Sequence, residues 1–197
     1  MNITDRQLAI IGATGKLIAS KGMSGLTVKT LAAEMGFVES ALYRHFKSKD
    51  DILVLMLEYL YQNIQERFDS ILAENVDAET KLKAIFDSQF QYFKKNPHFV
   101  MVVLSDGLID ESEGMRNQII KMFLYKIQII NQLVSECISK GKFNPIINQD
   151  SLVHFLMGGF RLTMFKWKSL KFSFDLVTEG NQMIDDFFTL ITQKVKQ

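Results

Sequence analysis

The chain has 197 residues, of which 47% are hydrophobic and 23% are charged. This composition excludes an intrinsically disordered protein, and the length suits one or two domains that each bury a core. The formal net charge of +1 excludes a uniformly basic protein, but residues 1–50 hold seven basic and four acidic side chains, an excess that permits a polyanionic partner at this end.

Only two prolines, Pro97 and Pro145, interrupt long runs with the apolar spacing of helices. The sequence therefore predicts an all-α protein. The first helix is expected over about residues 4–21 and ends at Gly22, since glycine readily adopts the backbone conformation that terminates a helix.

Two short helices are expected next. Thr27 is positioned to cap the first of them, residues 28–35, because its hydroxyl can accept from an unpaired amide of the first turn. Gly36 ends that helix, and the second short helix follows over about residues 39–46. This sequence of helix, glycine turn and helix predicts a helix-turn-helix.

Longer helices are expected after the joint between Lys47 and Ser48, where Ser48 and Asp51 resemble a capping box. The joint predicts an N-terminal domain of residues 1–47 and a helical domain of residues 48–197. The expected long helices cover residues 48–74, 77–95, 113–140, 152–170 and 175 to nearly the end, capped in part by Asp77 and by Asp150 or Ser151.

Aromatic and basic side chains are concentrated around the second short helix. Leu42 and Phe46 lie four residues apart and are expected to face inward, which turns the opposite face of this helix toward solvent. In a helix-turn-helix that face enters the major groove of DNA. The residues expected to face DNA on this reasoning are Glu39, Ser40, Ala41, Tyr43, Arg44, Lys47 and Lys49. A solvated basic patch with one core phenylalanine is the alternative.

The segment LTVKTLAAEMGFVESALYRHFKSKDDIL closely resembles the DNA-binding signature of the TetR family of bacterial transcriptional regulators. The resemblance is specific over residues 4–53 and extends beyond them only in length and helix order. The matching positions are Thr27, Leu31-Ala32, Gly36, Leu42-Tyr43, His45-Phe46, Lys49 and Leu53.

The resemblance implies that double-stranded operator DNA is the partner and that Thr27, Tyr43 and Lys49 anchor its phosphate backbone. His45 belongs to the same motif. Two departures affect base recognition. Val38 stands where the family often has a serine that caps the recognition helix, and Glu39 stands where a basic or neutral residue is common. Base preference is therefore not transferable from relatives.

The resemblance also implies a C-terminal domain that binds an effector and forms a homodimer. Phe86, Phe90 and Phe93 are spaced four and three residues apart and share one helix face. They fit either an ordinary core or the wall of a pocket for a small apolar effector, uncharged or singly charged, because no cluster of basic residues is evident in the segments concerned. The expected lining residues are Phe86, Phe90, Phe93, Met101, Met122, Phe123, Met164 and Trp167.

The last two predicted helices carry apolar arcs wider than a single packing contact requires. This breadth indicates burial against a second subunit, unless both helices lie at the centre of the bundle. The expected dimer-interface residues are Leu152, Phe155, Gly159, Leu162, Ile184, Phe188 and Ile191.

Other chemistry finds little support in the sequence. His45, His98 and His154 are not paired with other ligands at a spacing typical of metal sites, and no catalytic motif is present, so we expect no metal, no cofactor and no enzyme. Cys137 is the single cysteine. The first residues lack a signal-peptide pattern and no run is long enough to span a membrane, so a cytoplasmic protein without a membrane partner is expected.

We therefore predict a repressor released from a near-palindromic operator by its effector. The alternative is a DNA-bound structural or partner-recruiting protein of the same architecture without a ligand.

Overall fold

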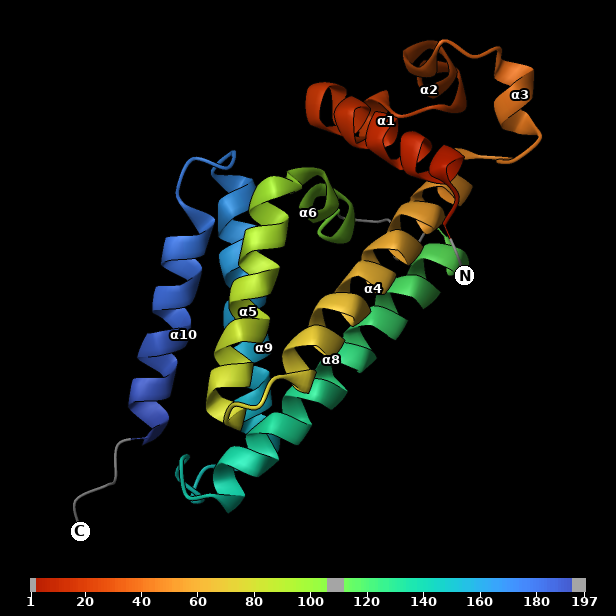
Figure 1. Ribbon diagram of the computed structural model, residues 1–197. Coiled ribbons are helices and arrows are strands. Elements are labelled where there is room, and N and C mark those ends of the chain that lie inside the picture. The colour runs from red at the N-terminus through yellow and green to blue at the C-terminus, as the bar shows by residue number, and fades with distance from the viewer. Residues whose placement is uncertain (1–2, 106–111, 193–197) are drawn as a thin grey trace. The chain divides into compact units, whose positions relative to one another are not determined.

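The computed structural model describes residues 3–105 and 112–192, and within these ranges it contains helices and no strand, which confirms the all-α expectation (Figure 1). The end of the last predicted helix, residues 193–197, lies outside the described residues. The α-helices are α1 (Asp5–Lys21), α2 (Val28–Met35), α3 (Glu39–Tyr43), α4 (Lys49–Ala73), α5 (Ala78–Lys95), α6 (Pro97–Val103), α8 (Glu113–Ser139), α9 (Gln149–Ser169) and α10 (Leu176–Thr192).

Side-chain caps fix most helix starts where the sequence predicts them. The Thr27 hydroxyl accepts from the amide of Thr30 at 3.0 Å, which confirms Thr27 as the N-cap of α2. The carboxylate of Asp51 accepts from the amide of Ser48 at 3.2 Å, and the Asp51 amide donates to the Ser48 hydroxyl at 3.4 Å. The predicted capping box at the start of α4 is therefore present.

Two boundaries differ from the prediction. The cap of α9 is Asn148, whose side chain accepts from the amides of Asp150 and Ser151, so neither of those two residues is the cap. The helix α3 ends at Tyr43 instead of Phe46, although the amide of Phe46 still donates to the Leu42 carbonyl at 2.9 Å. The chain after Tyr43 continues as a turn that keeps Phe46 in the core.

The helices form two compact units. Unit 1 comprises the described residues of 1–63 and 96–122, and unit 2 comprises those of 64–95 and 123–197. The two longest helices, α4 and α8, contribute residues to both units. The functional boundary between Lys47 and Ser48 stays a prediction.

Unit 1 contains the three N-terminal helices, the first halves of α4 and α8, and α6. The helix α1 packs against α2 and α6. At Gly15 a β-carbon would lie 3.0 Å from the imidazole of His98 on α6, so glycine permits this close approach. Burial lowers the pKa of His98 below its usual value, which favours the neutral ring in this contact.

In unit 2, α10 packs against both α5 and α9 (Figure 1). Aromatic side chains fill this packing: the Phe160 ring of α9 lies 5.4 Å from Phe90, 5.9 Å from Phe86 and 6.4 Å from Phe93, measured between centroids. Nowhere in the described ranges is a helix both long and apolar enough to cross a bilayer.

Candidate nucleic-acid interface and regulatory surfaces

The turn between α2 and α3 depends on one glycine. Gly36 has φ +66° and ψ +27°, in the left-handed region that side chains rarely adopt. The amide of Phe37 donates to the carbonyl of Ala32 at 2.9 Å, which closes the C-terminal end of α2. The chain then reverses and presents α3 at an angle to α2, as a helix-turn-helix requires.

The inner face of α3 is buried as predicted. Leu42 is fully buried and Phe46 is nearly so. The predicted DNA-facing residues lie on the accessible side: Thr27, Glu39, Ser40, Tyr43, Arg44, His45 and Lys47 are exposed, whereas Ala41 and Lys49 are half-buried.

The start of α3 reflects the departure from the family pattern. Val38 is the N-cap residue, and its side chain forms no cap hydrogen bond. It is 70% exposed, so its isopropyl group is available to a thymine methyl but supplies no hydrogen bond to a phosphate.

The replacement Lys49→Ala is expected to weaken binding to all duplexes about equally. Lys49 is the first residue of α4, where its charge adds to the positive end of the helix dipole beside the expected phosphate path. Loss of one phosphate contact should lower the slope of log affinity against log salt by ~1. Fluorescence anisotropy over a salt series measures this slope, with Lys140→Ala in unit 2 as the control. A changed base preference at constant slope contradicts the role.

The predicted pocket residues are divided between the two units. Phe86, Phe90, Phe93, Met164 and Trp167 are buried in unit 2. Met122 is buried and Met101 half-buried in unit 1, and Phe123 is exposed on α8.

Two observations in unit 2 were not anticipated from the sequence. Phe160 joins the three phenylalanines of α5 into one cluster, and Arg67 of α4 contacts α5 through hydrogen bonds to Ser88 and Gln89. Phe160 belongs to a series of apolar residues at helical spacing, so its burial could be predicted from the sequence. Arg67 is a single charged residue on a long helix, and no sequence pattern indicates its contact with α5.

The predicted interface residues separate into a buried and an exposed group. Leu152, Ile184, Phe188 and Ile191 are at most 4% exposed within the protomer, so they belong to its core. At Gly159 a β-carbon would lie 2.9 Å from the sulfur of Met183 on α10, so this glycine serves packing within the chain. Phe155 and Leu162 are 61% and 66% exposed.

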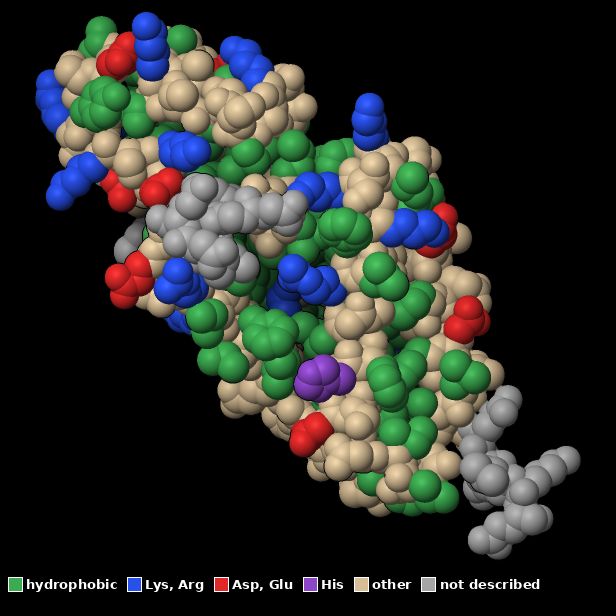
Figure 2. Space-filling view, turned by 180° about the vertical axis from the view of Figure 1, so that it is seen from behind, with side chains coloured by type: hydrophobic (Ala, Val, Ile, Leu, Met, Phe, Trp, Pro, Cys, Tyr) green, Lys and Arg blue, Asp and Glu red, His purple; other side chains and the backbone are tan. Residues whose placement is uncertain are grey.

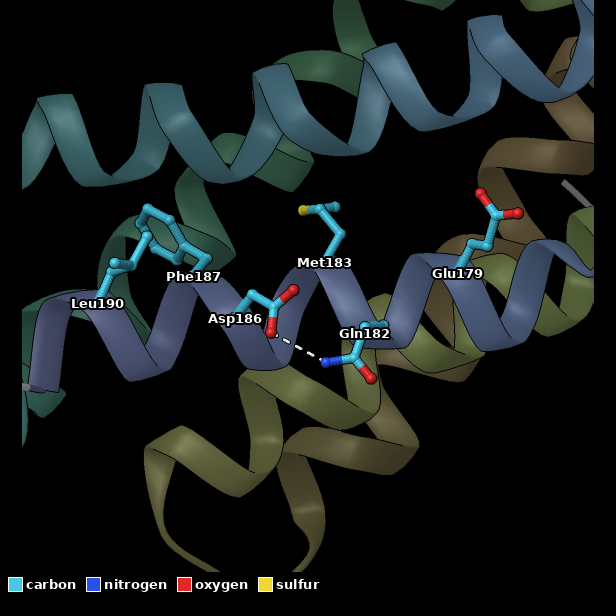
Figure 3. A pocket seen from close by; sticks show the side chains of 6 residues that line it. All are labelled: Glu179, Gln182, Met183, Asp186, Phe187 and Leu190. Atoms are coloured by element: carbon cyan, nitrogen blue, oxygen red, sulfur yellow. Dashed lines mark hydrogen bonds between the residues drawn. The ribbon is translucent and has the colours of Figure 1, made fainter.

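A groove lined by residues of α10 runs along one face of that helix. Figure 3 shows Met183, Phe187 and Leu190 projecting along it, with Gln182 and Asp186 beside them. Hydrophobic side chains also gather along the face that α9 and α10 present in Figure 2. Contiguous apolar surface of this kind, rimmed by polar groups, is typical of an interaction site.

Metal-binding chemistry has no counterpart in the described residues: nowhere in residues 3–105 and 112–192 do three His, Cys, Asp or Glu side chains gather as a metal site would require. Cys137 is buried, and burial together with neighbouring carboxylates raises the pKa of its thiol to about 12, which disfavours a reactive thiolate.

Comparison with known families matches both parts of the chain. The family model for bacterial regulatory proteins of the tetR family matches residues 10–56, and that for the C-terminal region of YsiA-like proteins matches residues 58–193.

Individual proteins are similar over most of the chain. The nucleoid occlusion factor SlmA of Vibrio cholerae is 23% identical over 98% of this chain and 96% of its own length. YerO, an uncharacterized HTH-type transcriptional regulator of Bacillus subtilis, is 30% identical over 64% of this chain and 42% of its own length.

Solved structures share the fold. FadR from Bacillus subtilis in complex with stearoyl-CoA superimposes with a TM-score of 0.78 at 22% identity, over 93% of this chain and 98% of that one. A TetR transcription regulator from Haloarcula marismortui gives a TM-score of 0.83 at 18% identity, over 97% of this chain and 100% of that one.

Proposed function

Because the chain belongs to the TetR family of bacterial regulatory proteins and is a DNA-binding regulator, we propose that it is a repressor that a small apolar effector releases from a near-palindromic operator. The observation that carries the DNA-binding part is the recognition helix, whose inner face is buried while Tyr43 and Arg44 on its outer face are exposed. Tyrosine hydroxyl and guanidinium groups are suitable donors to phosphate oxygens and base edges.

The proposed operator complex contains two copies of the chain. Two recognition helices must reach successive major grooves about 34 Å apart, which one short helix-turn-helix cannot do. We assign the dimer interface to the exposed apolar side chains of α9 and α10, because burying them removes apolar surface from water. They are Phe155, Leu162 and Leu190, to which we add Met183 and Phe187, which are half-buried and line the groove of α10.

The proposed effector site lies in unit 2 beside the aromatic cluster around Phe160. Phenylalanine rings from two helices offer an apolar surface suited to a hydrocarbon chain. FadR, which has a similar fold, was solved with stearoyl-CoA, and this supports an effector that contains a long hydrocarbon chain.

The helix α4 is the proposed link between effector and DNA. It begins at Lys49 in unit 1 and continues to Ala73 in unit 2, and its apolar residues Leu60, Ile64 and Phe68 are buried. An effector that favours one position of this helix changes the position of Lys49 and thereby the spacing of the two recognition helices. By linkage, operator DNA must weaken effector binding by the same factor.

The release step is tested with the single tryptophan. Trp167 is buried, and its indole donates to the carbonyl of Phe174 at 3.0 Å, so an effector bound nearby is expected to change its emission. An operator is first selected from random duplex DNA. Titration with stearoyl-CoA is then expected to change Trp167 emission and release the operator over the same concentration range. Saturation of the emission change with unaltered operator affinity contradicts the proposal.

A second function is favoured by the similarity to SlmA, which extends over 98% of this chain. In that case the DNA-bound dimer recruits a protein partner, and its DNA affinity is indifferent to metabolites. A panel of apolar metabolites that leaves operator binding unchanged, together with DNA-dependent capture of a partner, distinguishes this function from ligand-controlled repression.

A further inference from the structure

Arg67 brings a positive charge into the helical packing of unit 2. Its guanidinium donates to the carbonyl oxygen of Ser88 at 2.8 Å, to the Ser88 hydroxyl at 2.9 Å and to Oε1 of Gln89 at 3.2 Å. The same group lies 4.7 Å from the centroid of the Tyr92 ring. These contacts orient the guanidinium along α5 and fix the side-chain amide of Gln89.

Gln89 is a polar residue in an apolar core, with only 2% of its surface exposed. Its oxygen accepts from Arg67, but its amide nitrogen has no hydrogen-bond partner among the described residues. Exchanging the oxygen and nitrogen of the Gln89 amide would bring its NH2 group against the N–H of Arg67, and two donors cannot form a hydrogen bond. The amide nitrogen is therefore the atom of Gln89 that lacks a partner. A buried donor without an acceptor is costly, and its presence indicates a missing acceptor.

Lys126 of α8 adds a second positive charge. Its side chain is half-buried, with the ammonium 5.5 Å from the centroid of the Phe160 ring, and Lys126 forms no ion pair with a carboxylate of the described ranges. Burial, and secondarily the charge of Arg67, lowers the pKa of Lys126 to about 8. The charge of Arg67 therefore acts on Lys126, and an anion beside the Lys126 ammonium would offset this repulsion.

We propose that Arg67, Gln89 and Lys126, here called the donor cluster, bind the anionic head group of the effector, with its apolar part against the ring of Phe160. A carboxylate or a phosphate meets the requirement, because either supplies several acceptor oxygens and a negative charge. This inference rests on the proposed effector-controlled function and adds the chemical class of the ligand: an amphipathic anion.

The arrangement also connects the head group to α4. Arg67 stands on α4, Gln89 on α5 and Lys126 on α8. An anion bound by all three side chains therefore joins three helices, one of which begins at Lys49 in the DNA-binding unit. The charge of the head group, and not only the bulk of the apolar part, is then what fixes the position of α4.

The test compares decanoate, decyl phosphate and 1-decanol, which share one alkyl chain and differ in head group. Isothermal titration calorimetry measures the affinity of each for the full-length protein and for Lys126→Met, which keeps much of the side-chain length and removes its charge. Lys126→Met is expected to weaken binding of the preferred anion at least about tenfold and to leave 1-decanol within about twofold. The anion that binds more tightly to the unaltered protein identifies the head group.

Two further variants separate the charge from the fold. Lys126→Arg keeps the charge and is expected to retain anion binding, and Lys121→Met removes an exposed lysine from the same helix and is expected to change nothing. Thermal unfolding checks that each variant is folded. Equal affinity of the unaltered protein for the alcohol and both anions overturns the inference, as does an equal loss of anion and alcohol binding in Lys126→Met.

Operator release is measured separately with the same compounds. Binding of an anion that depends on Lys126 but does not release the operator supports the donor cluster and contradicts ligand-controlled repression. Release by 1-decanol as effective as release by either anion supports the proposed function and overturns the donor cluster.

Discussion

Replacing Leu162 with glutamate is expected to convert the dimer into monomers and to abolish specific operator binding. Leu162 is 66% exposed on α9, so the substitution leaves the protomer core intact while placing a charge in the proposed interface. Operator affinity should fall at least about a hundredfold, because a monomer holds only one of two half-sites. Light scattering reports the oligomeric state, and anisotropy reports the affinity.

The matched control is Val76→Glu, which introduces the same charge at an exposed apolar residue between α4 and α5. The Val76→Glu variant is expected to remain dimeric. Phe188→Glu does not serve as an interface test, because Phe188 is 2% exposed and its ring lies 5.3 Å from that of Phe143 in the core. If the Leu162→Glu variant stays dimeric at micromolar concentration, α9 does not form part of the dimer interface.

Replacing Gly180 with alanine is expected to lower the free energy of unfolding by about 1–3 kcal/mol, as overpacking of a core does. A β-carbon at Gly180 would lie 2.6 Å from the ring of Phe90, which is fully buried in unit 2 and cannot move away without displacing its neighbours. Urea denaturation at a fixed protein concentration, with the oligomeric state checked, measures the change.

Gly158→Ala supplies the comparison, since Gly158 lies in α9 and nothing approaches its β-carbon position within 4 Å. Alanine there is expected to stabilise the protein by up to about 1 kcal/mol through its higher helix propensity. Equal stabilities of the two variants would show that Phe90 can adjust, and that the contact between α5 and α10 is looser than the structure indicates.

The sequence by itself determined the features that depend on neighbouring residues. The capping side chains of Thr27 and Asp51 act within four residues, and Gly36 provides the left-handed turn locally. The exposed outer face of the recognition helix also follows from the spacing of Leu42 and Phe46, because residues four apart in an α-helix lie on the same face. The cap of α9 was missed, because Asn148, Asp150 and Ser151 are all suitable capping residues.

Only the tertiary structure decided which of two apolar faces meets the protomer's own core. On α9 the spacing groups Leu152 with Phe155, yet the structure buries Leu152 and leaves Phe155 exposed. The hydrophobic effect is non-directional, so the sequence around an apolar residue does not indicate which surface will bury it.

The donor cluster illustrates the same limit for charges. Arg67 and Lys126 are 59 positions apart in the chain, and each stands on a long helix that carries several other charged residues. The sequence shows no basic cluster in the segments of the predicted pocket because α4 and α8 supply one positive charge each, and the spare amide comes from α5. Their convergence arises from the packing of these helices, and a charge becomes costly, and able to attract an anion, only where that packing has removed water.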